Sequence, residues 1–283
     1  MVSIDKLTFR YNKKDYRPAV SDITGRIAEG IVLLLGENGA GKTTLLRLIA
    51  GKLIPQEGTV DLHPGNPASR MPSVLNRLFF VGDDMTIPSR DIVTFARDFG
   101  ILYPNFSAET LSSNLEEFGL TGTERFDSLS LGNRHKTLIA FALALGVDLL
   151  LLDEPANGLD ITSKASLRRM MARCVGPDQT VLISTHTVAD LHELYDGVMV
   201  MSKGRLLLSV STYEVASRLA FTVSDIPPRE ALFFEQRAGR FHSVTPLPPG
   251  SEPVTETDYS LLYSALLSPK ADEIITLLTK NDD

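Results

Sequence analysis

The chain has 283 residues, 43% of them hydrophobic and 22% charged, with a formal net charge of −7 at pH 7. This length and composition allow one large globular domain with an appendage. The acidic balance argues against nucleic acid as a partner, because a negative field repels phosphate backbones. The single cysteine, Cys174, excludes an intramolecular disulfide and a cysteine-rich zinc site. We expect Cys174 to be a buried, inert thiol in a reducing compartment.

The apolar segments are too short for export or membrane insertion. Met1–Tyr11 alternates apolar and polar residues, so it lacks the continuous apolar stretch of a signal peptide. The most apolar window, Leu138–Leu152, is shorter than the ~20 residues that span a bilayer, and it contains Asp148. The sequence therefore predicts a cytoplasmic chain that does not itself insert into the membrane.

The first part of the chain predicts strands around a glycine-rich loop. Ser3–Arg10 and Val20–Ile27 have the alternation of antiparallel strands. The apolar run Ile31–Leu35 is typical of a strand buried on both faces. A glycine-rich loop and a short helix that Gly51 terminates come next, and Arg77–Val81 predicts another strand.

Residues from about 86 to 140 predict a helical insert. Asp91–Phe118 has helical character, with a break at Pro104 because proline cannot continue a helix. Apolar residues then recur at helical spacing across Gly132–Leu145.

Strands and helices continue to alternate after the insert. Asp148–Leu152 predicts a central parallel strand, Ser163–Arg173 a helix, and Thr180–Ser184 a further strand. This order predicts an α/β fold with a largely parallel central sheet, joined by the antiparallel β subdomain and the helical insert. We place this domain at residues 1–219.

Residues 220–283 predict a small acidic and proline-rich appendage. The segment from residue 219 onward holds ten of the 35 acidic residues, five of the 28 basic residues and seven of the 16 prolines. A hairpin about Ala238 and Gly239 and one or two helices after Thr257 are expected there. We expect the appendage to buttress the main domain.

A phosphate-binding loop is the strongest chemical signal. The motif GxxxxGK[ST] lies between the buried strand and the helix, which is the context that this motif requires. It consists of Gly36, Glu37, Asn38, Gly39, Ala40, Gly41, Lys42, Thr43 and Thr44. Glycines let backbone N–H groups and the helix N-terminus face phosphates, Lys42 reaches the β and γ oxygens, and Thr43 ligates Mg²⁺. A purely structural glycine turn does not explain the Lys42–Thr43 pair.

Two carboxylates follow the strand that ends at Leu152. Asp153 and Glu154 would lie at the C-terminal edge of the parallel sheet, where ligands of such folds bind. We expect Asp153 to hold Mg²⁺ and Glu154 to orient and polarise the attacking water. A solvated pair at a strand end is the simpler alternative, which the upstream loop disfavours.

Residues 1–218 resemble the ATP-binding cassette (ABC) family of P-loop nucleotidases. Ser130 and Gly132, in the run LSLGN, open a helix 21 residues before Asp153 and are similar to the family's LSGGQ signature. Asp160 ends the run NGLD, which is similar to the family's D-loop. His186, 32 residues beyond Glu154, corresponds to the switch histidine of the family.

This resemblance also assigns an adenine contact and an assembly. Tyr11 corresponds to the aromatic residue that stacks on adenine, and Tyr16 is a rival for that role. The family binds two ATP molecules between two cassettes arranged head to tail, and Ser130 of one cassette contacts the ATP of the other. ATP and Mg²⁺ are therefore the implied cofactors. The implied partners are a second cassette, identical or different, and a separate transmembrane subunit on whose cytoplasmic side the chain sits.

Several positions depart from the family pattern or keep a second interpretation. Asp83 occupies the place of the Q-loop glutamine and is a candidate Mg²⁺ ligand, although near the γ-phosphate its charge would add repulsion. Leu131 and Asn133 replace a glycine and a glutamine of the signature. By itself His186 would be taken for a satisfied histidine at a strand end. The remaining histidines receive no role: His63, His135, His192 and His242.

The leading functional prediction is the ATP-hydrolysing subunit of a multi-chain transporter. Aromatic residues of the insert, at Phe95–Phe99 and Tyr103–Phe106, resemble bacterial export-type cassettes, so an exporter is favoured over an importer. Two alternatives stay open at this point: a cassette ATPase that acts on a ribosome or on DNA, and a regulatory cassette that binds nucleotide without hydrolysing it.

Overall fold

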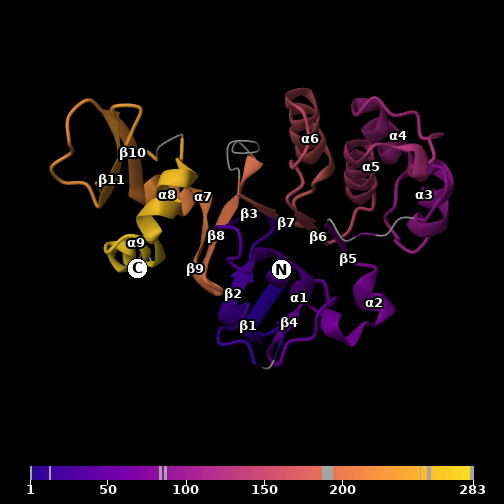
Figure 1. Cartoon of the computed structure of the whole chain (residues 1–283), viewed down its shortest axis with the longest axis horizontal. Coiled ribbons are helices and arrows are strands. Elements are labelled where there is room, and N and C mark those ends of the chain that lie inside the picture. The colour runs from indigo at the N-terminus through magenta and orange to yellow at the C-terminus, as the bar shows by residue number, and fades with distance from the viewer. Residues whose placement is uncertain are drawn as a thin grey trace.

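The structure is a computed structural model that describes residues 2–12, 14–82, 85, 88–186, 194–248, 250–253 and 256–280. At its centre is a six-stranded sheet with the order β5-β6-β7-β3-β8-β9 (Figure 1). In this order its strands are Leu78–Val81, Leu149–Asp153, Thr180–Thr185, Gly30–Leu35, Gly197–Ser202 and Arg205–Ser211. The pairings from β5 to β8 are parallel and only β9 is antiparallel to its neighbour. The predicted α/β fold with a largely parallel sheet is confirmed.

A second, antiparallel sheet carries the N-terminal strands. Its order is β2-β1-β4, with the strands Val20–Ile27, Val2–Phe9 and Glu57–Asp61. Its inner face packs against helix α1 (Lys42–Ile49) in a shared hydrophobic cluster. Helix α1 ends at Ile49 with Ala50 as its C-cap, one residue before the predicted cap Gly51, which follows with φ +68°. Glycine suits that position because the left-handed conformation carries no Cβ penalty there.

The helical insert lies at one end of the molecule (Figure 1). It contains α3 (Ile92–Gly100), α4 (Ala108–Glu117) and α5 (Leu131–Ala144), and Pro104 falls between the first two helices as expected. A short α2 (Pro72–Leu75) precedes β5. The connections also contain two 3₁₀ turns, at Pro67–Ser69 and Phe126–Ser128.

A fully buried asparagine joins the insert to α6 (Ile161–Cys174). The Asn114 side chain in α4 donates to the Ala140 carbonyl in α5 at 3.1 Å and accepts from Arg173 Nη2 at 2.9 Å. The Cys174 Sγ lies 3.6 Å from the same Asn114 oxygen. Cys174 is half-buried rather than buried, because it is the last residue of α6, where the packed face of the helix ends.

The appendage forms at the opposite end of the molecule (Figure 1). Helix α7 leads into a sheet of order β10-β12-β11, and α8 and α9 follow. In chain order these elements are Thr212–Arg218 (α7), Leu219–Ser224 (β10), Phe233–Arg237 (β11), Arg240–Pro246 (β12), Tyr259–Leu266 (α8) and Ala271–Thr279 (α9). Arg237 pairs with Arg240 across the turn at Ala238 and Gly239, so the predicted hairpin and terminal helices are confirmed.

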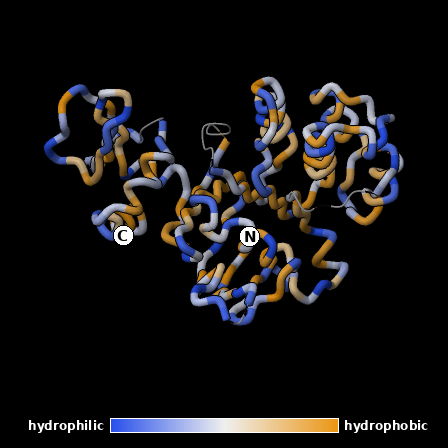
Figure 2. Tube along the Cα trace, in the orientation of Figure 1, coloured by the Kyte–Doolittle hydropathy of each residue, from blue (hydrophilic) through white to orange (hydrophobic). Residues whose placement is uncertain are grey.

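The appendage shares a hydrophobic core with the main sheet. Buried side chains of α8 and α9, among them Leu262 and Ile274, belong to the same cluster as Val200 of β8 and Leu208 of β9. Figure 2 shows apolar segments concentrated along the central strands. This packing agrees with the buttressing role expected for the appendage. No helix in the described part of the chain combines the length and the apolar character that crossing a bilayer demands.

Candidate functional site

The loop between β3 and α1 is fixed by two glycines that pack against neighbouring backbone. A Cβ atom on Gly36 would lie 2.6 Å from the Met201 carbonyl oxygen, so no side chain fits there. Gly41 has φ +102°, and a Cβ atom on it would lie 2.4 Å from the Ala19 carbonyl oxygen. The motif glycines therefore let the loop wrap tightly between β8 and the residue before β2.

The N-terminus of α1 is left open by this loop. Gly41 is the N-cap and provides no side-chain acceptor for the N–H groups of the first turn. Those donors remain available for an anion, and the helix dipole favours negative charge at this end. Thr43 is half-buried in the first turn, so its hydroxyl belongs to the same open end.

Lys42 carries the positive charge of the loop and is almost entirely buried. Its Nζ donates to the carbonyl oxygens of Gly36 at 2.7 Å and Glu37 at 3.2 Å, and lies 3.9 Å from Glu154 Oε1. Burial lowers the pKa of Lys42, whereas the charges of Glu154 and Asp153 act to raise it. The ammonium group therefore points to the edge where both carboxylates lie.

Asp153 is the buried last residue of β6. The Ser184 hydroxyl, directly opposite in β7, donates to Asp153 Oδ1 at 2.5 Å and fixes the orientation of the carboxylate. A carboxylate is an oxygen donor of the kind that Mg²⁺ prefers. Within the described ranges no cluster of three or more His, Cys, Asp or Glu residues could hold a metal by itself.

Glu154 is held by His186 at the end of the neighbouring strand. His186 Nδ1 lies 3.0 Å from Glu154 Oε2, and the His186 backbone N–H donates to the same oxygen at 3.3 Å. The Glu154 N–H donates to the Ser184 carbonyl at 3.0 Å, and the residue has φ +51° in the left-handed region. This arrangement aims a mostly buried carboxylate at the edge where the loop begins, and it can accept a proton there.

The signature residues lie on a different element from the phosphate loop. Ser130 is the N-cap of α5, and its hydroxyl accepts from the Asn133 N–H at 3.2 Å. Gly132 lies in the first turn of this helix, which belongs to the insert, whereas the loop lies between β3 and α1 (Figure 1). His135, one turn further, donates through Nε2 to the Pro155 carbonyl at 3.0 Å. The first turns of α5 are therefore tied to Pro155, the residue that follows Glu154.

Asp160 caps α6 next to the same helix. Its Oδ1 accepts from the Thr162 hydroxyl at 2.6 Å and the Ser163 N–H at 2.7 Å, and Lys136 Nζ lies 3.6 Å from Oδ2. The hydrogen bond from Thr162 is the largest cause that lowers the pKa of Asp160, and with the bonds from Ser163 it holds this pKa far below its usual range. Asp160 is therefore a fixed negative charge between α5 and α6.

The two tyrosine candidates differ in their surroundings. Tyr11 forms a hydrogen bond through its hydroxyl with Thr44 Oγ1 at 3.1 Å and packs edge-on against Phe9. Its ring is half exposed beside the phosphate loop, whereas Tyr16 is 93% exposed. The structure thus brings Tyr11 to the site. Asp83, the candidate metal ligand, and His192 lie outside the described residues.

Three contacts of the site are absent from the sequence-based prediction. The partnership of Ser184 with Asp153 follows from aligning the ends of two parallel strands, a signal that was present in the sequence. His135 lies five residues after Ser130, but nothing in its spacing points to Pro155. Tyr263 of α8 accepts a hydrogen bond from the Glu37 N–H across 226 residues, and no local pattern indicates that contact.

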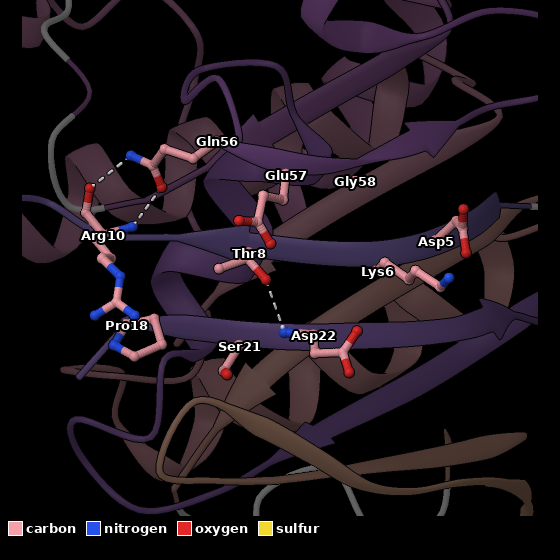
Figure 3. A pocket seen from close by; sticks show the side chains of 10 residues that line it. All are labelled: Asp5, Lys6, Thr8, Arg10, Pro18, Ser21, Asp22, Gln56, Glu57 and Gly58. Carbon is pink, nitrogen blue, oxygen red and sulfur yellow. Dashed lines mark hydrogen bonds between the residues drawn. The ribbon is translucent and has the colours of Figure 1, made fainter. Parts of the chain in front are cut away.

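A separate groove of about 830 Å³ lies on the outer face of the antiparallel sheet. Figure 3 shows Arg10 hydrogen-bonded to Gln56 at one end, and Thr8 to the Asp22 N–H near the middle. Its lining mixes acidic with basic residues on the face opposite α1, so this groove is not part of the phosphate site.

Comparison with known proteins identifies the family. The ABC transporter family profile matches residues 20–157. The ABC transporter ATP-binding protein NatA of Bacillus subtilis is 32% identical over 219 residues, covering 73% of this chain and 88% of NatA. The taurine import ATP-binding protein TauB of Yersinia pestis is 33% identical over 214 residues, covering 72% of this chain and 80% of TauB.

Solved structures show the same fold. The dimeric, post-hydrolysis cassette MJ0796 with ADP and Pi superposes with a TM-score of 0.65 at 21% identity, covering 75% of this chain and 98% of that one. A putative cobalt transport ATP-binding protein, ST1066, superposes with a TM-score of 0.67 at 19% identity, covering 97% of this chain and all of that one. Together with the sequence relatives, these matches show that the chain belongs to the ABC transporter family of ATPases.

Proposed function

We propose that the chain is the ATP-hydrolysing subunit of a multi-chain ABC membrane transporter and works in a head-to-tail dimer of cassettes. One observation carries the proposal: Lys42 of the phosphate loop, Asp153 and the Glu154–His186 pair meet at one edge of the sheet. Such a convergence of a buried cation, a metal-type carboxylate and a positioned base suits phosphoryl transfer to water.

Each group takes a distinct part in the reaction. The open N-terminus of α1 and Lys42 bind the phosphates of ATP, with Tyr11 against the adenine. Thr43 and Asp153 hold Mg²⁺, which when bound neutralises charge on the phosphate oxygens. Glu154 orients the attacking water and accepts its proton, and His186 keeps the Glu154 carboxylate in place.

The dimer gives Ser130 and Gly132 their role. The first turn of α5 would contact the γ-phosphate of the ATP held by the partner cassette. Asp160, a fixed charge beside Lys136 of that helix, would stabilise the surface that faces the partner cassette. Removal of the γ-phosphate then loses contacts to both cassettes at once, so ATP closes the dimer and hydrolysis opens it.

A separate transmembrane subunit is the partner that this role requires, with the chain peripheral on the cytoplasmic face. The names of the relatives point in both directions of transport: TauB is named for import, and a bacterial Atm1-family exporter superposes with a TM-score of 0.63. We propose export. Phe95 and Phe106 belong to the aromatic residues whose pattern favours export, and both pack on Phe141 inside the insert. The support for export therefore comes from the sequence of the insert and not from an exposed surface.

Isolation of the tagged full-length chain from its native cells in mild detergent tests the proposed function. We expect a multi-span membrane protein in stoichiometric amount, together with one or two kinds of cassette. Ribosomes, DNA, or only a second active cassette without a membrane chain would contradict the proposal. Everted and right-side-out vesicles of the purified complex then decide the direction: ATP-dependent uptake into everted vesicles is expected for an exporter.

Alanine variants of the neighbouring residues Asp83 and Asp84 form a matched pair. If Asp83 has taken the place of the Q-loop glutamine near Mg²⁺, Asp83→Ala lowers hydrolysis and shifts its Mg²⁺ dependence to higher concentrations by about 3- to 10-fold. Asp84→Ala leaves both unchanged. The measurement is a Mg²⁺ titration of ATPase activity in the assembled transporter. An unchanged rate and metal dependence for Asp83→Ala would remove Asp83 from the metal site.

A further inference from the structure

Helix α8 of the appendage lies against the main sheet next to the phosphate loop. Its buried residues, among them Leu262 and Ala265, belong to the same hydrophobic cluster as Leu35 of β3 and Val200 of β8. At the start of α8, the Tyr259 ring packs edge-on against Tyr195 with centroids 5.8 Å apart. The helix is therefore anchored by apolar packing independently of any polar contact at the loop.

One turn after Tyr259, the same helix reaches the phosphate loop through a tyrosine. The Tyr263 hydroxyl oxygen accepts a hydrogen bond from the Glu37 backbone N–H at 3.2 Å. Burial raises the pKa of Tyr263, and its hydroxyl also interacts with the side chains of Glu37 and of Ser202 at the end of β8. The phenol is thus neutral at physiological pH, and can accept from the loop while donating to a neighbour.

The two hydrogen-bonding ends of a single peptide group are held from opposite sides. The Glu37 N–H and the Gly36 carbonyl belong to the same planar peptide. Tyr263 holds the N–H end, whereas Lys42 Nζ donates to the carbonyl end at 2.7 Å. Because the peptide is rigid, a rotation of its N–H end also moves the carbonyl oxygen that positions the Lys42 ammonium.

We propose that Tyr263 is a positioning residue of the ATP site, through which the C-terminal appendage sets the orientation of the Gly36–Glu37 peptide and, with it, of Lys42. The proposal rests on the proposed role of residues 36–44 in phosphate binding. Tyr263 contacts neither Glu154 nor His186 in this arrangement, so it acts on nucleotide binding and not on the chemical step. The appendage is then a part of the ATP site as well as a buttress.

The test compares Tyr263→Phe with Tyr213→Phe in the full-length chain. Tyr263→Phe removes one hydroxyl and keeps the ring, whereas Tyr213 on α7 is 69% exposed and provides a matched loss of a phenol. Loss of one hydrogen bond is expected to weaken ATP binding by about 3- to 10-fold, measured as a Kd by calorimetry and as KM. The kcat should stay within about 2-fold of wild type, and Tyr213→Phe should change neither constant.

A second background shows whether the effect passes through Glu37. Glu37→Pro removes the backbone donor together with the side-chain carboxylate, so adding Tyr263→Phe to it should change the ATP Kd by less than about 2-fold. An undiminished effect of Tyr263→Phe in the proline background would overturn the proposal. So would an unchanged Kd and KM for the single variant, or a loss of thermal stability with no change in affinity measured well below the unfolding temperature.

These results are distinguishable from failure of the proposed function. If the wild-type chain binds ATP and loses binding in Lys42→Ala, but Tyr263→Phe binds normally, the phosphate site stands and only the role of Tyr263 is refuted. If the folded wild-type chain does not bind ATP at all, the proposed phosphate site fails, and the role of Tyr263 fails with it.

Discussion

Replacing Glu154 with glutamine is expected to slow ATP hydrolysis by about 100-fold or more while ATP binding stays within about 2-fold of wild type. The substitution keeps the shape of the side chain but removes the carboxylate that can accept a proton from water. The Lys42 ammonium, 3.9 Å away, still faces a polar side chain, so the phosphate loop keeps its geometry. ATP that binds is then not consumed, and the closed dimer should accumulate.

Three measurements on Glu154→Gln separate binding from chemistry. Turnover is measured in the assembled transporter, the ATP Kd on the isolated chain, and the dimer fraction by size-exclusion chromatography with and without ATP. Glu116→Gln, an exposed glutamate on α4, is the matched control and should behave as wild type in all three. Turnover of Glu154→Gln at the wild-type rate would show that another group activates the water.

Lys42→Ala is expected to abolish measurable ATP binding, a loss of about 100-fold or more. Lys42 is the buried cation of the loop, and its Nζ lies 3.9 Å from Glu154 Oε1. Without it, the phosphates would meet Asp153 and Glu154 with less compensating positive charge, so repulsion adds to the lost attraction.

Calorimetric titration with ATP checks this expectation, with circular dichroism to confirm that the variant is folded. Lys270→Ala is the control, because Lys270 is 56% exposed in the appendage and pairs only locally with Glu273. Normal ATP affinity in a folded Lys42→Ala variant would contradict the phosphate-site assignment itself. Loss of binding in both variants would instead indicate a general loss of structure.

Most of the fold was predictable because its signals are local. The apolar runs that form β3, β6 and β7 are too short for buried helices. Helical segments separate them along the chain, and such alternation indicates a parallel sheet. Pro104 marked the break between α3 and α4, and Ala238 with Gly239 marked the hairpin. The antiparallel edge strand β9 was not predicted, although Lys203 and Gly204 before it both have the positive φ of a tight hairpin turn.

The parts of the candidate site that depend on the order of motifs along the chain were predictable. Asp153 ends β6, and Lys42, Glu154 and His186 follow β3, β6 and β7 of one parallel sheet, whose strand ends share an edge. Contacts made by side chains across elements were not predictable in the same way. Tyr263 meets Glu37 because α8 packs on the sheet through apolar residues. The sequence of an apolar face does not indicate which surface it packs against, so this contact was not predictable.

The backbone of Glu154, the proposed catalytic base, implies a trade-off between stability and activity. A residue other than glycine at φ +51° costs about 1–2 kcal/mol relative to its preferred conformation. Glycine would relieve this strain, yet it would remove the carboxylate that His186 holds. The strained turn directs the side chain back toward the sheet edge rather than along the strand. Selection for thermal stability alone would therefore drive this position toward glycine, whereas the proposed role of Glu154 in ATP hydrolysis would oppose that substitution.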